Sequence, residues 1–285
     1  MSQTIAGVYV AAVTPFAASG EIDLDAFTGH ARWLAARGVH GIMPFGTNGE
    51  GPSVGLEEKR RALDRLFRAG LSCQIVPAVM QGNLPETLAL VRMISDLPAS
   101  AVVVLPPYYF KPASADGLRA FLEPVIAASR HPVILYHIPK YAVPVPVELV
   151  GSLDVWGVKD SGGEPGYAEA VLRAGRGVLV GTEDDLWTRL RGGAAGMISA
   201  LANAVPERIL EIYELARRND AAAGRPLAER LQQVRAMTKA YAAPGVLKRL
   251  AQARHGLPMG TVRPPLLPVP DPYDPGPILR LAAVD

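Results

Sequence analysis

Eight short apolar segments, most of them rich in Val and Ile, alternate with longer amphipathic segments, and this alternation is the feature that most constrains the fold. Continuous apolar segments of this kind are typical of parallel strands buried on both faces. Repeated strand–helix units imply right-handed crossovers, and hence a parallel sheet that is either open or closed into a barrel. The expected strands are Val8–Val13, Gly41–Phe45, Gln74–Val79, Ala101–Leu105, Val133–Ile138, Val155–Val158, Val178–Val180 and Gly196–Ala200.

Helical segments with recognisable start signals lie between these strands. Leu24–Ala36 follows Asp23, a good N-cap residue, and Leu56–Ala69 carries acidic residues in its first turn. Pro85 suits the first turn of the next helix, which we expect to end near residue 96. From residue 206 to residue 255 the pattern is helical only, and the eight prolines between residues 258 and 277 predict an extended surface segment.

The first strand decides between an open sheet and a barrel. An open dinucleotide-binding sheet carries a Gly-rich turn after its first strand, whereas Thr14, Pro15 and Phe16 follow here. Eight strands within about 200 residues favour a (β/α)8 TIM barrel, an α/β fold. We therefore expect a catalytic barrel over residues 1–220 and C-terminal helices with a proline-rich tail over residues 221–285.

Composition excludes several classes of protein. Among 285 residues, 29 basic and 27 acidic side chains leave a net charge of +2, so neither nucleic acid nor a membrane surface is an expected partner. Cys73 is the one cysteine, which excludes an intrachain disulfide, and the five histidines have no metal-ligand spacing. No apolar run is long enough for a membrane helix, and the first basic residue is Arg32. We expect a cytoplasmic enzyme without a metal.

Lys159 is the first candidate for chemistry, because active sites of such barrels lie where the strands end. It follows a buried strand, where burial disfavours the charged amine and frees it to attack carbonyls. Tyr136 ends the preceding strand, and a phenol beside an amine can transfer protons. The alternatives are a lysine that extends its amine to solvent or pairs with Asp160, and a tyrosine that only fills the core.

The loop from Gly46 to Gly51 offers backbone amides, the Thr47 hydroxyl and the Asn48 amide, which together suit a small carboxylate. No Lys-Ser or Lys-Thr pair follows its last glycine, so it is not a nucleotide-binding P-loop. A tight turn without a ligand is the alternative interpretation.

Taken in order, these strand ends resemble those of the dihydrodipicolinate synthase and N-acetylneuraminate lyase superfamily of pyruvate-dependent class I aldolases. The matches span nearly the whole chain. The matching segments are Thr14–Phe16, Gly46–Glu50, Pro107–Tyr109, Tyr136–Pro139, Gly157–Ser161, Gly181–Glu183 and Gly196–Ser199.

The resemblance implies a barrel enzyme that needs no external cofactor. Lys159 would form a Schiff base with a 2-oxo acid such as pyruvate, and Tyr136 would be the proton shuttle. Thr47 and Asn48 fall where the family binds the keto-acid carboxylate and relays protons. An iminium withdraws electrons from the neighbouring bonds, so the expected chemistry agrees with the residues present.

The resemblance also implies a homotetramer, built as a dimer of dimers, and a small-molecule substrate. Tyr109 matches a tyrosine that family members lend to the neighbouring subunit's site, and Ile198 a residue whose carbonyl group faces it. Glu183 and Asp184, after Gly181, fall where related lyases hold sugar hydroxyls; the alternative is that Asp184 caps a helix and Glu183 faces solvent. Ser161 and Ser199 lie at strand ends and can add hydroxyl contacts.

Three departures from the synthase pattern bear on the substrate. Asn48 replaces a second threonine, His137 replaces an asparagine, and Tyr141 stands where true synthases carry an arginine for the second substrate's carboxylate. The Gly51–Ser53 continuation looks like that of 2-keto-3-deoxygluconate aldolases. We therefore expect an aldolase acting on a 2-keto-3-deoxy sugar acid or a 4-hydroxy-2-oxo acid; a dehydratase, a dihydrodipicolinate synthase and a non-catalytic sensor are the alternatives.

Overall fold

The strands form the inner ring of a (β/α)8 barrel in the computed structural model, which describes residues 4–283. All paired strands are parallel, and the sheet order is β3-β2-β1-β9-β8-β7-β6-β5-β4. Their bounds are β1 Gly7–Ala11, β2 Gly41–Met43, β3 Gln74–Ile75, β4 Ala78–Val79, β5 Val102–Val104, β6 Val133–His137, β7 Gly157–Asp160, β8 Gly177–Val180 and β9 Gly196–Ser199.

The two outermost strands in this order, β3 and β4, are two halves of one barrel strand. Pro77 has no N–H to donate and interrupts the strand between them. On one side the Ala78 N–H still donates to the Pro44 carbonyl, and on the other the Val103 N–H donates to the Pro77 carbonyl, both at 3.0 Å. The sheet therefore closes, and the eight expected strands are confirmed.

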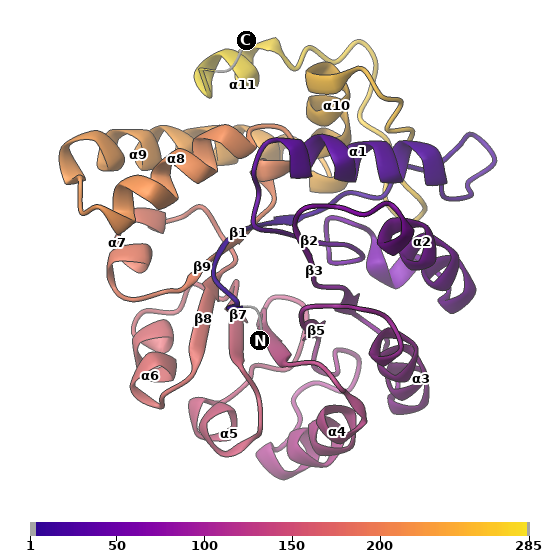
Figure 1. Cartoon of the computed structure of the whole chain (residues 1–285), viewed down its shortest axis with the longest axis vertical. Helices are drawn as coiled ribbons and strands as arrows, with labels where there is room; N and C mark the ends of the chain where they lie inside the picture. The colour runs from indigo at the N-terminus through magenta and orange to yellow at the C-terminus, as the bar shows by residue number, and fades with distance from the viewer. Residues whose placement is uncertain (1–3, 284–285) are drawn as a thin grey trace.

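The helices cover the outside of this ring (Figure 1). Leu24–Ala36 is a helix as predicted, with the Asp23 side chain accepting from the Asp25 and Ala26 amides. The helices over 56–68 and 84–95 agree with prediction to within one residue. The bounds are α1 Leu24–Ala36, α2 Leu56–Arg68, α3 Leu84–Ser95, α4 Ala115–Ala128, α5 Val147–Ser152, α6 Tyr167–Arg173, α7 Leu186–Arg191, α8 Pro206–Arg217, α9 Ala221–Met237, α10 Ala243–His255 and α11 Gly276–Leu281.

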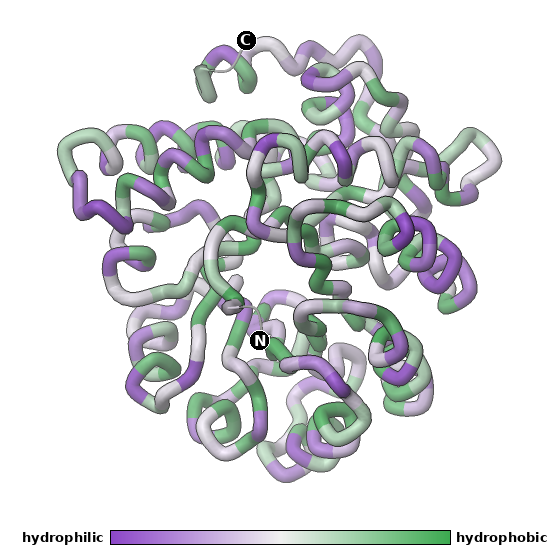
Figure 2. The backbone as a smooth tube through the Cα atoms, in the orientation of Figure 1, coloured by the Kyte–Doolittle hydropathy of each residue, from purple (hydrophilic) through white to green (hydrophobic). Residues whose placement is uncertain are grey.

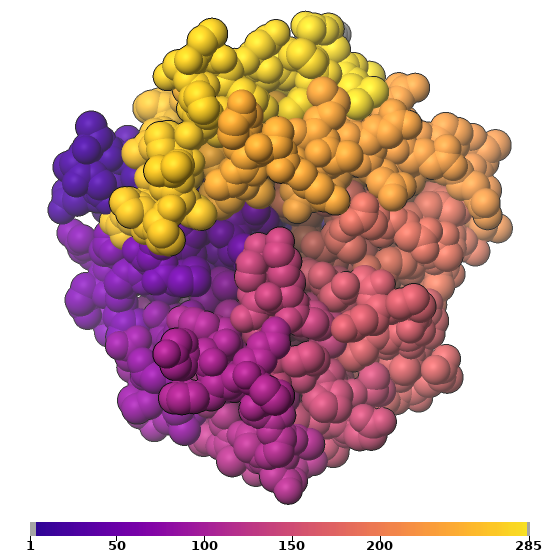
Figure 3. Space-filling model, turned by 180° about the vertical axis from the view of Figure 1, so that it is seen from behind, coloured from indigo at the N-terminus to yellow at the C-terminus, as the bar shows by residue number. Residues whose placement is uncertain are grey.

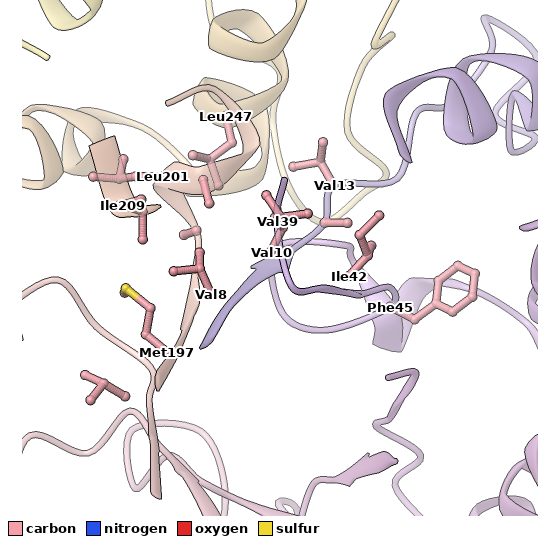
Figure 4. Close-up of a cluster of buried hydrophobic side chains, with 14 of the residues drawn as sticks. Val8, Val10, Val13, Val39, Ile42, Phe45, Met197, Leu201, Ile209 and Leu247 are labelled. Atoms are coloured by element: carbon pink, nitrogen blue, oxygen red, sulfur yellow. The ribbon is translucent and has the colours of Figure 1, made fainter. Parts of the chain in front are cut away.

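Alternate strand residues face two separate apolar cores. Tyr9, Ile134 and Leu179 lie in the smaller cluster inside the barrel, whereas their chain neighbours pack outward against the helices. Figure 2 shows the strands as mostly apolar and the outer helices as mixed, and Figure 4 shows outward-facing Val8 and Met197 near the elements that follow β9. This alternation determines which strand-end side chains enter the barrel.

The C-terminal residues pack against the first part of the chain. Helices α9, α10 and α11 lie on one side of the ring, beyond α1 and α8 (Figure 1), and residues 257–275 contain no helix or regular strand. Seen from behind, the yellow C-terminal segment lies against the indigo and purple N-terminal part (Figure 3). The Arg263 side chain donates to the Gly20 carbonyl at 2.9 Å, which fastens the two parts together. Residues 258–275 lack regular structure as predicted, whereas Gly276 and Pro277, expected to be extended, begin α11.

Candidate active site

Lys159 and Tyr136 lie side by side inside the barrel. They are register partners on β7 and β6, so their side chains leave the same face of the sheet. The Lys159 Nζ is 4.0 Å from the centroid of the Tyr136 ring, and both residues are at most 3% exposed. Lys159 lies within β7 rather than after it, because that strand begins two residues later than predicted and extends to Asp160.

The Lys159 amine contacts a sulfur atom and an aromatic ring. The alternative interpretation of the sequence predicts an ion pair there. Its Nζ lies 3.9 Å from the Met43 Sδ, and across residues 4–283 it forms no ion pair with a carboxylate. Asp160 points to the opposite face of β7, where it pairs with Arg189 and accepts from the Gly162 amide at 2.9 Å. The interpretation in which Lys159 pairs with Asp160 is therefore wrong.

Tyr136 is surrounded by groups that favour its ionised form. Burial by itself raises the pKa of the phenol, but the charge of Lys159 and hydrogen bonds from Thr47, Lys159 and Ser161 oppose it, and the net shift of the Tyr136 pKa is downward. The Thr47 Oγ1 lies 3.3 Å from the Tyr136 hydroxyl oxygen. A phenol that loses its proton more readily is suited to proton transfer.

The loop that carries Thr47 is held in a constrained backbone conformation. Phe45 and Glu50, on either side of it, have φ angles of 62° and 53°, the left-handed region that non-glycine residues rarely adopt. The Thr14 hydroxyl donates to the Gly49 carbonyl at 2.7 Å. A Cβ on Gly51 would lie 1.8 Å from the Phe45 carbonyl oxygen, so only glycine fits there. The backbone of this loop is therefore held in one conformation.

The two acidic residues after β8 have different surroundings. Glu183 is 2% exposed; its Oε1 accepts from the Ser199 hydroxyl at 2.7 Å, and its Oε2 lies 3.4 Å from the Arg235 Nε. Asp184 is exposed and accepts from the Thr182 hydroxyl at 2.9 Å. Glu183 therefore does not face solvent, and Asp184 does not cap α7, whose N-cap position is the next residue along.

The other predicted site residues divide into an inner and an outer group. Ile198 lies in the cluster inside the barrel, Gly181 donates its amide to the Asp160 carbonyl at 2.7 Å, and Asn48 is partly buried. Tyr109 is 80% exposed and is not brought to Lys159 within this subunit. The structure thus gathers Lys159, Tyr136, Thr47 and Ser161 and leaves Tyr109 outside.

His137, one of the departures from the synthase pattern, faces away from the barrel interior. Its ring stacks on Tyr167 with centroids 3.8 Å apart. Its Nδ1 accepts from the Val145 amide, which places the proton on Nε2, 2.5 Å from a Glu164 carboxylate oxygen. His137 therefore links the strand of Tyr136 to the loop after Lys159.

A model of the dihydrodipicolinate synthetase family matches residues 4–275 of this chain. The chain belongs to this family. It is 31% identical over 278 residues to an uncharacterised DapA-like lyase of Chloroflexus aurantiacus, covering 92% of this chain and 91% of the relative. It is 30% identical over 280 residues to the 4-hydroxy-tetrahydrodipicolinate synthase of Rhizobium meliloti, covering 93% of each.

A variant of the Sulfolobus solfataricus 2-keto-3-deoxygluconate aldolase has the same fold, with a TM-score of 0.89 at 23% identity over 97% of this chain and 95% of the aldolase. Membership makes this chain a lyase of the pyruvate-dependent class I type. The sequence resemblance to this superfamily is thereby confirmed.

Sequence reasoning missed the contacts of this family member that join distant segments. Met43 beneath the amine, Arg189 behind Asp160 and Arg235 on Glu183 were not anticipated. An arginine on an amphipathic helix has the same pattern whether it faces solvent or a buried carboxylate. No signal in the local sequence identifies such partners.

The other end of the barrel offers no comparable chemistry. A cavity of about 590 Å³ there is lined by the segments before β1, β2 and β3 and includes Cys73 and His40. Burial raises the pKa of the Cys73 thiol to about 11, so its reactive thiolate is disfavoured. Within residues 4–283, no group of three or more potential ligands is placed to hold a metal ion, and no helix is long and apolar enough to cross a bilayer.

Proposed function

We propose that Lys159 forms a Schiff base with a 2-oxo acid such as pyruvate, and that the enzyme thereby cleaves or forms the bond between pyruvate and an aldehyde. The substrate class is a 2-keto-3-deoxy sugar acid or a related 4-hydroxy-2-oxo acid. One observation carries this proposal: a buried amine without a carboxylate partner among the described residues lies 4.0 Å from a buried phenol whose pKa is lowered.

The chemistry follows from these groups. The Lys159 amine attacks the C2 carbonyl, Tyr136 donates its proton to the carbinolamine oxygen, and loss of water leaves an iminium. Tyr136 then takes the proton of the C4 hydroxyl, the C3–C4 bond breaks, and its electrons move into the enamine while the aldehyde leaves. Protonation of C3 and hydrolysis release pyruvate and restore the amine. Thr47 supports Tyr136 in both proton transfers.

For the distal hydroxyls of the substrate we propose the segment from Gly181 to Asp184. The exposed carboxylate of Asp184 and the hydroxyl of Ser161 are available acceptors, and ionised carboxylates only accept hydrogen bonds, which hydroxyls donate. Glu183 already binds Ser199 and Arg235, so we assign it the support of this segment. An aldehyde with its own carboxylate suits this end of the site badly, because like charges repel.

The decisive test is reductive trapping. Incubation with pyruvate and borohydride, followed by peptide mass mapping, is expected to add the reduced pyruvyl group to Lys159. Lys140, an exposed lysine three residues after the strand of Tyr136, is the internal control. Equal labelling of Lys140 and Lys159, or an unmodified Lys159, would contradict the assignment. The products formed from a panel of keto-deoxy sugar acids then identify the substrate and separate cleavage from dehydration.

Dihydrodipicolinate synthesis is the second candidate, favoured by the synthase relative at 30% identity. Against it stands Tyr141, which is 49% exposed and offers no bidentate cation for a second carboxylate. The Lys140 ammonium lies 5.0 Å from the Tyr141 ring, a point charge without that geometry. Turnover of pyruvate with aspartate semialdehyde in the usual enzymatic range of about 1–10³ s⁻¹ would promote this candidate.

We also propose a homotetramer in which Tyr109 reaches the neighbouring subunit's site. Tyr109 and Phe110 form an edge-to-face pair with both rings about four-fifths exposed, an arrangement that favours a partner surface. Light scattering is expected to give about four times the chain mass of 30.3 kDa. A monomer that turns over at the full rate would exclude this role for Tyr109.

A further inference from the structure

Glu50, in the loop that carries Thr47, is held by residues from the far end of the chain. It is 3% exposed, and its Oε1 lies 2.7 Å from the Lys248 Nζ, an ion pair between residues 198 positions apart. Its Oε2 accepts from the Arg263 backbone amide at 2.8 Å. Both carboxylate oxygens are therefore bound by the C-terminal segment.

Lys248 is as buried and as fully hydrogen-bonded as Glu50. It lies on α10, is 1% exposed, and also donates to the Thr261 carbonyl at 2.5 Å. Its Nζ is 4.3 Å from the centroid of the Phe16 ring, and the Arg263 guanidinium lies 4.2 Å from the same ring. Two cations from the C-terminal segment thus contact the Phe16 ring, which lies in the loop after β1.

The backbone of Glu50 passes this restraint on to Thr47. The Glu50 N–H donates to the Thr47 carbonyl at 3.2 Å, and the Glu50 carbonyl accepts from the Ser53 amide at 2.8 Å. Glu50 has a left-handed φ of 53°, which costs free energy unless the surroundings enforce it. The buried ion pair and the Arg263 amide fix the side chain of this strained residue.

We propose that the Glu50–Lys248 ion pair is a positioning element of the active site. It holds the loop so that the Thr47 hydroxyl stays within reach of Tyr136, although neither Glu50 nor Lys248 touches the reacting lysine. The proposal rests on the function proposed above. It gives the C-terminal helices a role in positioning the active-site loop, because α10 supplies the cation that binds Glu50.

The test compares two variants with the parent enzyme. Lys248→Met keeps the length of the side chain and removes the charge, and Glu50→Gln removes the partner charge with little change of shape. Pyruvate and borohydride first count the sites that form the Lys159 adduct, and kcat is then expressed per trappable site. We expect kcat per site to fall about 10²-fold in both variants, since a misplacement of about 1 Å can cost that much.

Arg249→Met is the matched control. Arg249 is the next residue on α10 and pairs with Asp271, a mostly exposed carboxylate, so its loss is expected to leave kcat per site within about twofold of the parent. If Lys248→Met and Glu50→Gln lower the number of trappable sites or the Tm but keep kcat per site within about threefold, the pair is only structural and the proposal is overturned. A parent enzyme that forms no adduct overturns the proposed function itself.

Discussion

Lys159 and Lys248 are both almost completely buried lysines, but they lie in opposite surroundings. Lys159, inside the barrel, is 2% exposed and contacts a sulfur and an aromatic ring. Lys248, where α10 meets the barrel, is 1% exposed and is bound by a carboxylate and a carbonyl group. Burial alone therefore does not separate a reactive lysine from one that positions a loop.

The partners make the distinction. Burial lowers the pKa of the Lys248 ammonium, and the charge and hydrogen bond of Glu50 oppose this shift by binding the nitrogen. Lys159 has no carboxylate partner among the described residues, so no ion pair occupies its nitrogen, the atom that attacks a carbonyl group. The interior around Lys159 is thus suited to chemistry, and the α10 contact around Lys248 to holding the loop of Glu50 in place. Four predictions test this comparison.

The largest expected effect is the loss of activity in Lys159→Ala. Turnover and the borohydride adduct with pyruvate are expected to fall below detection, because Lys159 is the amine that contacts Tyr136 among residues 4–283. Stability in a urea titration is expected to be unchanged or higher, since the lysine is buried without an ion pair. A large loss of stability would mean that Lys159 serves mainly to hold the fold.

Tyr136→Phe is expected to lower kcat by about 10²–10⁴-fold, the usual contribution of a positioned acid–base group. Pyruvate should still be trapped on Lys159, but more slowly, because the amine remains. Steady-state kinetics and trapping rates measure the two effects separately. A variant within twofold of the parent enzyme would remove Tyr136 from the mechanism.

Lys248→Met is expected to destabilise the fold by about 3–5 kcal/mol, the usual cost of leaving a buried carboxylate unpaired. Arg249→Met, which removes a pair with a mostly exposed carboxylate on the same helix, is expected to cost less than about 1 kcal/mol. Urea unfolding of both variants measures the difference. Equal costs would show that Glu50 finds another partner.

The fourth prediction is a loss of stability in acid where the same helix, α10, contacts α1. His255 on α10 lies 3.1 Å from His30 on α1, and the other His30 nitrogen is 3.0 Å from the Asn203 Oδ1. Burial lowers the pKa of His30 to about 4, and burial together with the charge of Arg37 lowers that of His255 to about 4. Both imidazoles are therefore neutral in the folded protein near neutral pH.

The sign follows from the difference between the two states. Above the unfolded pKa of about 6.5 neither state binds these protons, and the fold keeps its full stability. As the pH falls from about 6.5 to about 4, only the unfolded chain is protonated, and stability decreases. For His30 alone, a shift of about 2.5 pH units corresponds to about 3 kcal/mol. Urea titrations at several pH values test this, and His30→Asn should flatten the slope between pH 6.5 and 4.

The barrel itself was predictable because its signals are local. All eight strand positions were predicted from continuous apolar segments, and α1 was predicted with its N-cap at Asp23. The shift of β7 shows the limit of this reasoning. Gly157 belongs to the strand and Val155 does not, because the pairing of Gly157 with Ile134 and Gly177, and not local composition, decides where β7 begins.

The candidate site was predictable where it depends on the strand order. Parallel neighbouring strands with a period of two bring Lys159 next to Tyr136, and the resemblance to the family pointed to Thr47. The acidic residues show the opposite case. Glu183 and Asp184 are equivalent in the sequence, but one is buried against Ser199 and Arg235 and the other is exposed.

The sequence by itself determined the barrel, the order of its strands' functional ends and the pair of residues proposed for chemistry. These depend on the periodicity of short segments and on the order of those segments along the chain, and both can be read from the sequence. Only the tertiary structure decided which buried charges meet, such as Glu50 with Lys248 across 198 positions. The physical reason is that a lysine on a helix has the same local pattern in solvent and in a buried pair, and only packing determines which carboxylate reaches it.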